Sequence, residues 1–265
     1  MGASRFVAFA LATFSLSWGA QAAPKEPVVW VNQWRKPPAR LQHLAFPSAA
    51  MDHKVGVSIL PPTHSEPAPL IIFLHGRGGD ETTDLHAFMG LVRKAVAAQQ
   101  LPEPLVVFPN GGLTGYRGSM ATMIAEELLP YLEQHYRVLP EPRHRLLAGF
   151  SMGGGGAVRI ALKYPETFGG AVSWGGGIWH KDTSLFESVA ARGERLSQLK
   201  PQFLLVNGSD DRPNAFLPLA EVFQQVGVDH QRITLEGVGH NMGVYFQDST
   251  DSFAHFLQPL WRESH

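Results

Sequence analysis

The sequence predicts an α/β fold in which helices cover both faces of a mostly parallel central sheet. Two observations carry this prediction. Short apolar runs without polar alternation recur along the chain, and such runs are typical of strands that are buried on both faces. Helical patterns separate these runs, and regular alternation of strands and helices indicates a parallel sheet with crossover connections.

The first expected strand differs from the later ones. Residues 53–62 alternate apolar and polar side chains, which predicts a half-buried strand that ends at Pro61 and Pro62. Continuous apolar runs predict buried strands over residues 69–76, 104–112, 145–151, 168–176 and 202–210, and a short last strand over 233–235.

The segments between the strands carry helical patterns. They predict helices over residues 84–100, 120–136, 152–165, 214–227 and 244–261, with a kink at Pro130 in the second. Residues 178–200 are expected to form a small insertion over the sheet. Because the chain shows no internal repeat, low-complexity linker or break in composition, we expect residues 24–265 to form a single domain.

Composition narrows the classes of function. The chain has 265 residues, of which 44% are hydrophobic and 17% charged, with a net charge of −1. These values suit a folded globular protein and give no support to a nucleic-acid partner or a polybasic membrane patch. The chain has no cysteine, which excludes disulfides, thiolate metal sites and a cysteine nucleophile.

The first 23 residues have the pattern of a secretory signal peptide. Arg5 supplies a positive start, residues 6–18 are mostly apolar, and residues 20–22 form a small-x-small ending. A membrane anchor is the alternative, but the apolar run is shorter than the roughly 20 residues that span a bilayer. We therefore expect cleavage near Ala22 or Ala23, export to the periplasm or the medium, and no stable membrane span.

Ser151 has the surroundings of a nucleophile. It is the central residue of Gly149-Phe150-Ser151-Met152-Gly153, a G-x-S-x-G pattern between an apolar run and a helical pattern. A serine on such a tight strand-to-helix turn leaves no room for side chains two residues before and after it. A phosphate-binding loop is the alternative, but neither G-K-[ST] nor G-x-G-x-x-G is present.

A nucleophilic serine needs a base and an orienting acid. In α/β folds that carry this G-x-S-x-G turn, the three residues follow along the chain in the order serine, acid, histidine. His240 lies in a predicted loop between the last strand and the last helix, whereas the other downstream histidines lie at less suitable places. Asp210 and Asp211 both lie in the loop after the preceding strand. Spacing alone does not choose between these two aspartates.

The remaining candidates surround this group. The backbone N–H of Met152 and that of Arg77 or Gly76, in the loop after an earlier strand, are the expected oxyanion donors. Tyr116, Trp174 and Trp179 lie on predicted strand-end loops and are candidates for the wall of a substrate site. No His/Asp/Glu spacing forms a recognisable metal site, and we expect neither a metal nor a cofactor.

These motifs together resemble a known family. The stretches "IIFLHGRGG", "VVFPNGG", "GFSMGG" with "YPETF", "NGSDD" and "GVGHN" are similar to those of the "putative esterase" family, which includes esterase D and feruloyl, acetylxylan and enterochelin-type esterases. The resemblance covers residues 41–260 and implies the α/β-hydrolase fold. It implies Ser151 as nucleophile, His240 as base and Asp211, not Asp210, as the acid. Two residues depart from the family pattern, Asn207 and Arg77.

The sequence thus predicts an exported serine esterase that works through an acyl-enzyme. The expected substrate is a small-molecule or polysaccharide-linked ester. An acyltransferase on the same triad and a serine peptidase are the catalytic alternatives, and a non-catalytic binding protein is the third. The oligomeric state is not predicted.

Overall fold

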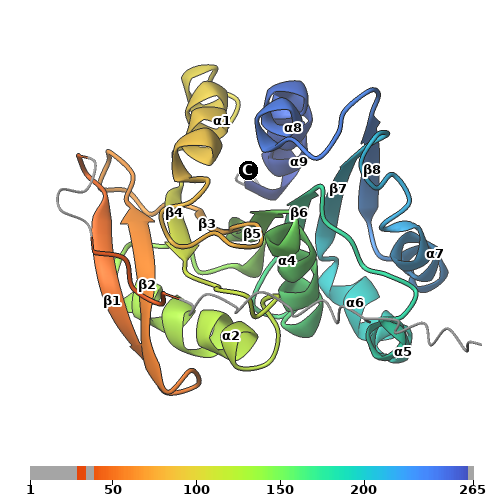
Figure 1. Ribbon diagram of the computed structural model, residues 1–265, viewed down its shortest axis with the longest axis horizontal. Helices are drawn as coiled ribbons and strands as arrows, with labels where there is room; N and C mark the ends of the chain where they lie inside the picture. Colours follow the sequence, from red (N-terminus) through yellow and green to blue (C-terminus); the bar gives the residue numbers. More distant parts are fainter. Residues whose placement is uncertain (1–28, 34–38, 262–265) are drawn as a thin grey trace, which may run out of the picture.

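The structure is a computed structural model that describes residues 29–33 and 39–261 (Figure 1). The expected signal peptide, residues 1–23, lies outside the described residues. Within them, eight strands form one sheet in the order β1-β2-β4-β3-β5-β6-β7-β8. The strands are β1 (Gln42–Ser48), β2 (His53–Leu60), β3 (Leu70–Leu74), β4 (Leu105–Pro109), β5 (Arg145–Phe150), β6 (Gly170–Trp174), β7 (Gln202–Gly208) and β8 (His230–Leu235). The pairs β1–β2 and β2–β4 are antiparallel and all others are parallel, which is the mixed, mostly parallel sheet of α/β-hydrolases.

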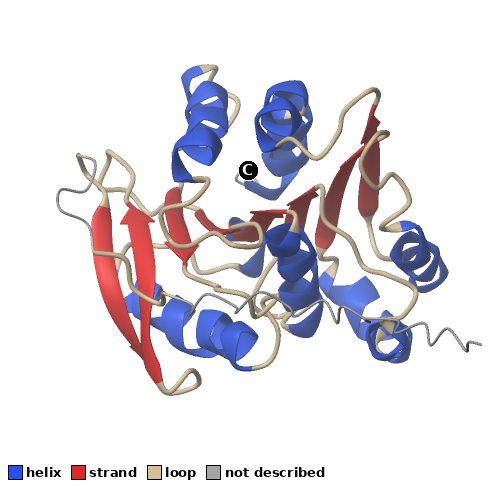
Figure 2. Cartoon of the chain, in the orientation of Figure 1, coloured by secondary structure: helices blue, strands red, loops and turns tan. Residues whose placement is uncertain are grey.

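Helices cover both faces of the sheet (Figure 2). One face carries α1 (Leu85–Ala97), α8 (Met242–Asp248) and α9 (Thr250–Trp261), and the other carries α2 (Ser119–Thr122), the π-helical η1 (Met123–Leu128), α3 (Leu129–His135), α4 (Met152–Lys163), α5 (Thr183–Ala191), α6 (Gly193–Leu199) and α7 (Leu217–Val226). A 3-10 turn, η2 (Pro142–His144), precedes β5. In the described part of the chain, no helix combines the length and apolar character needed to cross a bilayer.

Strand β3 shows why the apolar runs lack alternation. All five of its residues are buried. Leu70, Ile72 and Leu74 enter the hydrophobic core on the α4 side, and Ile71 and Phe73 enter the core on the α1 side. A strand between two cores needs apolar side chains in both directions, so this prediction from the sequence is confirmed.

The helix predicted over 120–136 is continuous but not uniform. It begins as α2, widens into η1 at Met123–Leu128 and returns to α-helical geometry in α3. The widened turn lies directly before Pro130, which has no N–H to donate and whose ring would meet the preceding turn of a regular helix. The irregularity expected at Pro130 therefore takes the form of a π-helical turn.

The helix predicted over 244–261 is interrupted. The chain forms α8 and α9, which Ser249 separates. The buried Ser249 hydroxyl donates to the carbonyl of Tyr245 at 2.6 Å and accepts from the indole N–H of Trp174 at 2.8 Å. Side-chain hydrogen bonds of this kind compete with the helical backbone, and the helical sequence pattern alone does not reveal them.

Strand β2 is more buried than its alternating pattern predicts. Its polar position Ser58 and its small position Gly56 are both buried. A side chain at Gly56 would overlap the carboxylate of Glu81. At Gly56, β2 therefore makes a covered contact with the Glu81 carboxylate and does not face solvent.

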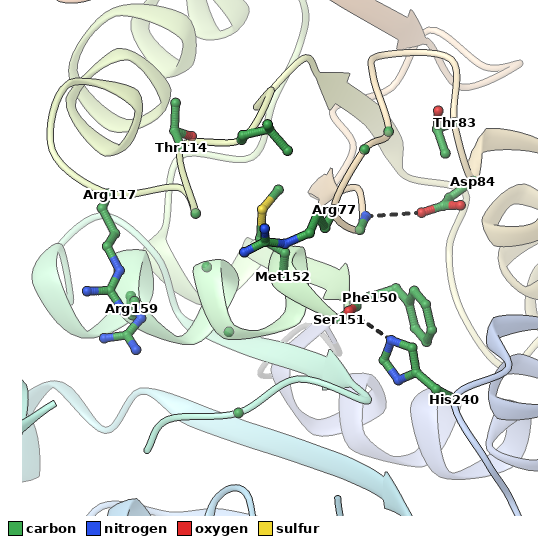
Figure 3. Close-up of a pocket in the computed structure, with 18 of the residues that line it drawn as sticks. Arg77, Thr83, Asp84, Thr114, Arg117, Phe150, Ser151, Met152, Arg159 and His240 are labelled. Carbon is green, nitrogen blue, oxygen red and sulfur yellow. Dashed lines mark hydrogen bonds between the residues drawn. The ribbon is translucent and has the colours of Figure 1, made fainter. Parts of the chain in front are cut away.

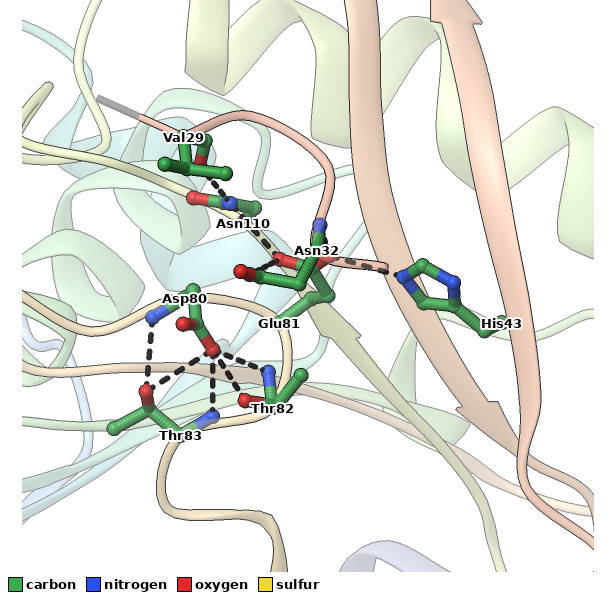
Figure 4. A network of polar contacts seen from close by, with 8 residues as sticks. All are labelled: Val29, Asn32, His43, Asp80, Glu81, Thr82, Thr83 and Asn110. Atoms are coloured by element: carbon green, nitrogen blue, oxygen red, sulfur yellow. Dashed lines mark hydrogen bonds and ion pairs between the residues drawn. The ribbon is translucent and has the colours of Figure 1, made fainter. Parts of the chain in front are cut away.

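Glu81 is the centre of that contact (Figure 4). Its fully buried carboxylate accepts from the backbone N–H of Asn32 at 2.6 Å and from the side-chain amide of Asn110 at 2.8 Å, and it pairs with Nε2 of His43 at 2.9 Å. The network joins residues 29–33, strand β1 and the loops after β3 and β4. It thereby braces the loop that continues from β3 into the candidate site.

Candidate active site

Ser151 occupies the turn between β5 and α4. Its backbone has φ 55° and ψ −115°, a conformation that L-residues rarely adopt and that is typical of strained functional positions. Its N–H donates to the carbonyl of Trp174 at 2.8 Å. Side chains at Gly149 or Gly153 would overlap backbone atoms of the neighbouring chain, which is the crowding that the sequence pattern predicts.

The structure brings His240 and Asp211 to this serine. Nε2 of His240 lies 2.8 Å from Oγ of Ser151, and Nδ1 of His240 lies 2.7 Å from Oδ2 of Asp211. The three residues follow β5, β7 and β8, whose carboxyl ends meet at one edge of the sheet, where ligands bind in open α/β sheets. Figure 3 shows the imidazole directed at Ser151.

Asp211 and its neighbour Asp210 have different surroundings. The Asp211 side chain is 5% exposed and also contacts Nε of Arg212 at 3.0 Å. Burial raises the pKa of the Asp211 carboxyl, but hydrogen bonds from His240, Arg212 and Tyr245 outweigh burial, so the pKa lies below its ordinary value. The exposed Asp210 instead accepts from the hydroxyl of Ser209. Asp211 is therefore the carboxylate that contacts the imidazole.

Two backbone N–H groups are available beside Ser151. Met152 is the first residue of α4, and N–H groups in the first turn of a helix have no intrahelical acceptor. The loop after β3 passes next to the serine: a side chain at Gly76 would lie 3.6 Å from Cβ of Ser151. The N–H of Gly76 is directed at Asp84, 3.3 Å away, which leaves that of Arg77 as the candidate donor in this loop.

His75 fixes the peptide that carries the Arg77 N–H. Its Nε2 lies 2.9 Å from the N–H of Gly111, so Nε2 accepts and Nδ1 bears the proton that is donated to the carbonyl of Gly76 at 2.7 Å. Burial lowers the pKa of His75 against the opposing effects of that hydrogen bond and of nearby carboxylates. The Gly76 carbonyl and the Arg77 N–H belong to one planar unit, so a neutral His75 orients both.

A cleft of about 780 Å³ opens at Ser151 (Figure 3). Its walls come from the loops after β3, β4, β6 and β7, and its floor from the first turns of α4. Four arginines and one acidic residue are among the residues that line it, namely Arg77, Arg117, Arg159, Arg212 and Asp84. Among the described residues, no group of three or more His, Cys, Asp or Glu side chains has the arrangement of a metal site.

Of the three aromatic residues predicted to wall the site, only Trp179 lines this cleft. Trp174 is fully buried and packs against Phe246 at a centroid distance of 5.0 Å. Its position at the end of β6 directs it into the core on the α8 side, so the prediction that Trp174 lines the substrate site is wrong. Tyr116 is also fully buried, beneath Gly111 and Gly156. The prediction that Tyr116 lines the site is also wrong, because the loop after β4 folds its ring into the protein interior.

The sequence analysis missed three side chains around the imidazole. The ring of Phe150 stacks on His240 at a centroid distance of 4.7 Å. The guanidinium of Arg212 lies 3.3 Å from Nδ1 of His240, and the hydroxyl of Tyr245 lies 2.9 Å from Oδ2 of Asp211. Phe150 and Arg212 are chain neighbours of predicted site residues, so the sequence could have indicated them. The sequence could not have indicated Tyr245, because a helical pattern does not show which tyrosine contacts a residue in another loop.

Comparison with known proteins agrees with this architecture. A family model described as "Putative esterase" matches residues 48–264, and the chain belongs to this family of α/β-hydrolases. Esterase Rv1288 of Mycobacterium tuberculosis is 31% identical over 151 residues, which are 52% of this chain and 32% of that protein. The chain thus spans about a third of the length of this curated relative.

Solved structures share the fold at lower identity. A ferulic acid esterase superposes with a TM-score of 0.70 at 20% identity, covering 84% of this chain and 97% of its own. An S-formylglutathione hydrolase from Staphylococcus aureus superposes with a TM-score of 0.65 at 17% identity, covering 82% and 96%. At these identities the likeness establishes the fold.

Proposed function

We propose that this protein is a serine carboxylic-ester hydrolase that acts through an acyl-enzyme formed on Ser151. The observation that carries the proposal is the continuous hydrogen-bonded row from Ser151 through His240 to Asp211, with contacts of 2.8 and 2.7 Å. Such a row is the arrangement by which a serine becomes a nucleophile at neutral pH. Membership of the esterase family supports an ester as the substrate.

In the first half-reaction, Oγ of Ser151 forms a bond to the ester carbonyl carbon while Nε2 of His240 takes the hydroxyl proton. The carbonyl oxygen becomes an oxyanion, which the N–H groups of Met152 and Arg77 stabilise. Each such donor contributes roughly 2.7–4 kcal/mol to the transition state. The intermediate then expels the alcohol, which receives the proton from Nε2, and the acyl group stays on Ser151.

In the second half-reaction, water attacks the acyl carbon and gives its proton to His240. Collapse of the new intermediate returns that proton to Ser151 and releases the carboxylic acid. Asp211 accepts from the imidazole throughout, and its lowered pKa keeps it ionised when the imidazolium forms. The stacked ring of Phe150 limits rotation of the imidazole between the two half-reactions.

The test is hydrolysis of p-nitrophenyl butyrate by the wild type and by Ser151→Ala. We expect the wild type to be active and the variant to lose on the order of 10⁴-fold or more in kcat. Ser197→Ala, which alters an exposed serine on α6 outside the row, is the matched control and is expected to retain activity. Equal activity of Ser151→Ala and the wild type would refute the proposal.

We also propose that the protein is exported and that its leader is removed near Ala22 or Ala23. The support is the sequence pattern of residues 1–23. Expression of the full chain in a bacterial host, followed by mass spectrometry of the exported and cytosolic fractions, tests this. We expect an exported chain that begins at Ala23 or Pro24, and a chain that keeps Met1 in the cytosol would contradict it.

A further inference from the structure

One end of the cleft carries more positive than negative charge. Arg117, in the loop after β4, lies 3.2 Å from Oδ1 of Asp182, and Arg159, on α4, lies 2.6 Å from Oδ2 of the same residue. Both arginines line the cleft. One carboxylate therefore balances only one of the two guanidinium groups at this end.

The two guanidinium groups differ in burial. The side chain of Arg159 is 14% exposed and that of Asp182 is 8% exposed, whereas that of Arg117 is 58% exposed. Burial lowers the pKa of Arg159, Asp182 opposes this effect, and the charge of Arg117 adds to it. Arg159 and Asp182 thus form a built-in pair, and Arg117 extends from this pair into the open cleft.

The first turns of α4 connect this end of the cleft to Ser151. Arg159 follows Ser151 by eight residues along α4, which is about 12 Å along a helix axis. Gly155 and Gly156 line the cleft between them. Figure 3 shows Arg77 over this stretch, between Ser151 and the two distal arginines. Within the described chain, Arg77 forms no ion pair, so it adds a further unbalanced charge along the path.

We propose that the natural ester carries a carboxylate about two helical turns from the scissile bond, and that Arg117 and Arg159 bind this carboxylate. The proposal rests on the proposed esterase function and names its substrate class. A guanidinium group matches a carboxylate in geometry and charge. Arg117, Arg159 and Asp182 together carry one surplus positive charge, which suits a single negative charge on the ligand.

The carboxylate belongs either to the acyl part or to the alcohol part of the ester, and two sets of probes distinguish these sources. The acyl set consists of p-nitrophenyl monoesters of dicarboxylic acids from adipate to sebacate. The alcohol set consists of acetate esters of ω-hydroxy acids of similar lengths. Each probe has a neutral partner in which a primary amide replaces the terminal carboxylate.

We expect one set to show a kcat/KM about tenfold or more above that of its amide partners, because hydrogen bonds between charged groups are the strong ones. The preference should increase with chain length until the carboxylate reaches the arginines. It should also decrease as salt is added, since the Arg117 head is exposed. Carboxylate probes that are no better than their amide partners in both sets would overturn the proposal.

Arg117→Gln tests the assignment to these residues. It leaves Asp182 paired with Arg159, so the fold should tolerate it, and we expect most of the carboxylate preference to disappear through a higher KM for the carboxylate probe. Arg195→Gln is the matched control, because Arg195 pairs with Glu166 on the surface and does not line the cleft. An unchanged preference in Arg117→Gln would show that the carboxylate binds elsewhere.

The same assays separate the two levels of the argument. If the amide probes are hydrolysed in a Ser151-dependent way but no carboxylate preference exists, the esterase function holds and only the substrate class fails. If the wild type hydrolyses no ester of either kind while remaining folded, both proposals fail.

Discussion

The hydroxyl of Tyr245 donates to the same carboxylate oxygen of Asp211 that contacts His240, at a distance of 2.9 Å. It also accepts from the backbone N–H of Gly208, at 2.6 Å. Burial raises the pKa of Tyr245 to about 12, and the neighbouring Asp211 adds to this effect against that of Gly208. The phenol therefore keeps its proton and holds the Asp211 carboxylate in position from helix α8.

Removing this hydroxyl should affect both rate and stability. In Tyr245→Phe, Asp211 loses one of its donors, and we expect kcat/KM to fall about five- to tenfold, the effect of one hydrogen bond. The free energy of unfolding should fall by about 1–3 kcal/mol because the buried Gly208 N–H loses its acceptor. Ester hydrolysis and urea unfolding measure these effects. Tyr131→Phe, on a ring that packs against Phe46, is the control, and equal effects in both variants would contradict the assignment.

The two adjacent aspartates provide a sharper test of the site. Asp211→Asn removes the charge that faces the imidazole and disturbs its tautomer, so kcat should fall by on the order of 10⁴, as for the corresponding change in the protease triad. Asp210→Asn changes an exposed carboxylate with a local partner and should leave kcat within about twofold of the wild type. A large loss in Asp210→Asn with little loss in Asp211→Asn would reverse the assignment.

His75 should make the fold sensitive to acid. Its pKa in the folded protein lies below the ordinary value of 6.5 because it is buried. As pH falls below 6.5, the unfolded chain takes up this proton first, so the stability contribution of neutral His75 is complete above pH 6.5 and is lost below it, by at most about 1.4 kcal/mol per pH unit.

The variant His75→Gln isolates this contribution. At pH 7.5 it should be less stable than the wild type by about 1–3 kcal/mol, because a glutamine does not reproduce the two hydrogen bonds that the imidazole makes to Gly111 and Gly76 at once. At pH 5.5 the difference should be smaller, since only the wild type loses the stability of a neutral imidazole. Urea unfolding at both pH values measures this, with the exposed His86→Gln as control. A difference that does not depend on pH would refute the argument.

The sequence predicted the fold well where the physics is local. Buried strands such as β3 follow from unbroken apolar runs, and the turn at Ser151 follows from the glycines around it. The predicted row of Ser151, Asp211 and His240 comes together in the structure, while the catalytic roles of these residues stay predictions.

Features that depend on distant parts of the chain were not predicted. The direction of Trp174 depends on which core its strand end faces, and the break at Ser249 depends on Trp174 in turn. The covered position of Gly56 depends on Glu81, which comes from another loop. Each of these requires knowledge of the packed sheet, which the local pattern of residues does not contain.

A last prediction compares two glycines, Gly153 and Gly90, whose surroundings differ although both lie in helices. Gly153 lies in the first turn of α4, where a side chain would overlap the backbone carbonyl of Leu74 at the end of β3. Gly90 lies inside α1, where a side chain would meet no atom within 4 Å. Both glycines occupy helical positions, where glycine costs about 0.5–1 kcal/mol relative to alanine.

Gly90→Ala should therefore raise the free energy of unfolding by about 0.5–1 kcal/mol and leave ester hydrolysis unchanged. Gly153→Ala should lower it by about 3 kcal/mol or more, because rigid backbone must move to admit the methyl group. The strand end that moves leads directly into His75 and Arg77, so kcat should fall as well. Urea unfolding and p-nitrophenyl butyrate hydrolysis compare the two variants. Equal stability of both would mean that α4 does not approach β3 as closely as the crowding at Gly153 requires, and the explanation of the glycine-rich turn would then fail.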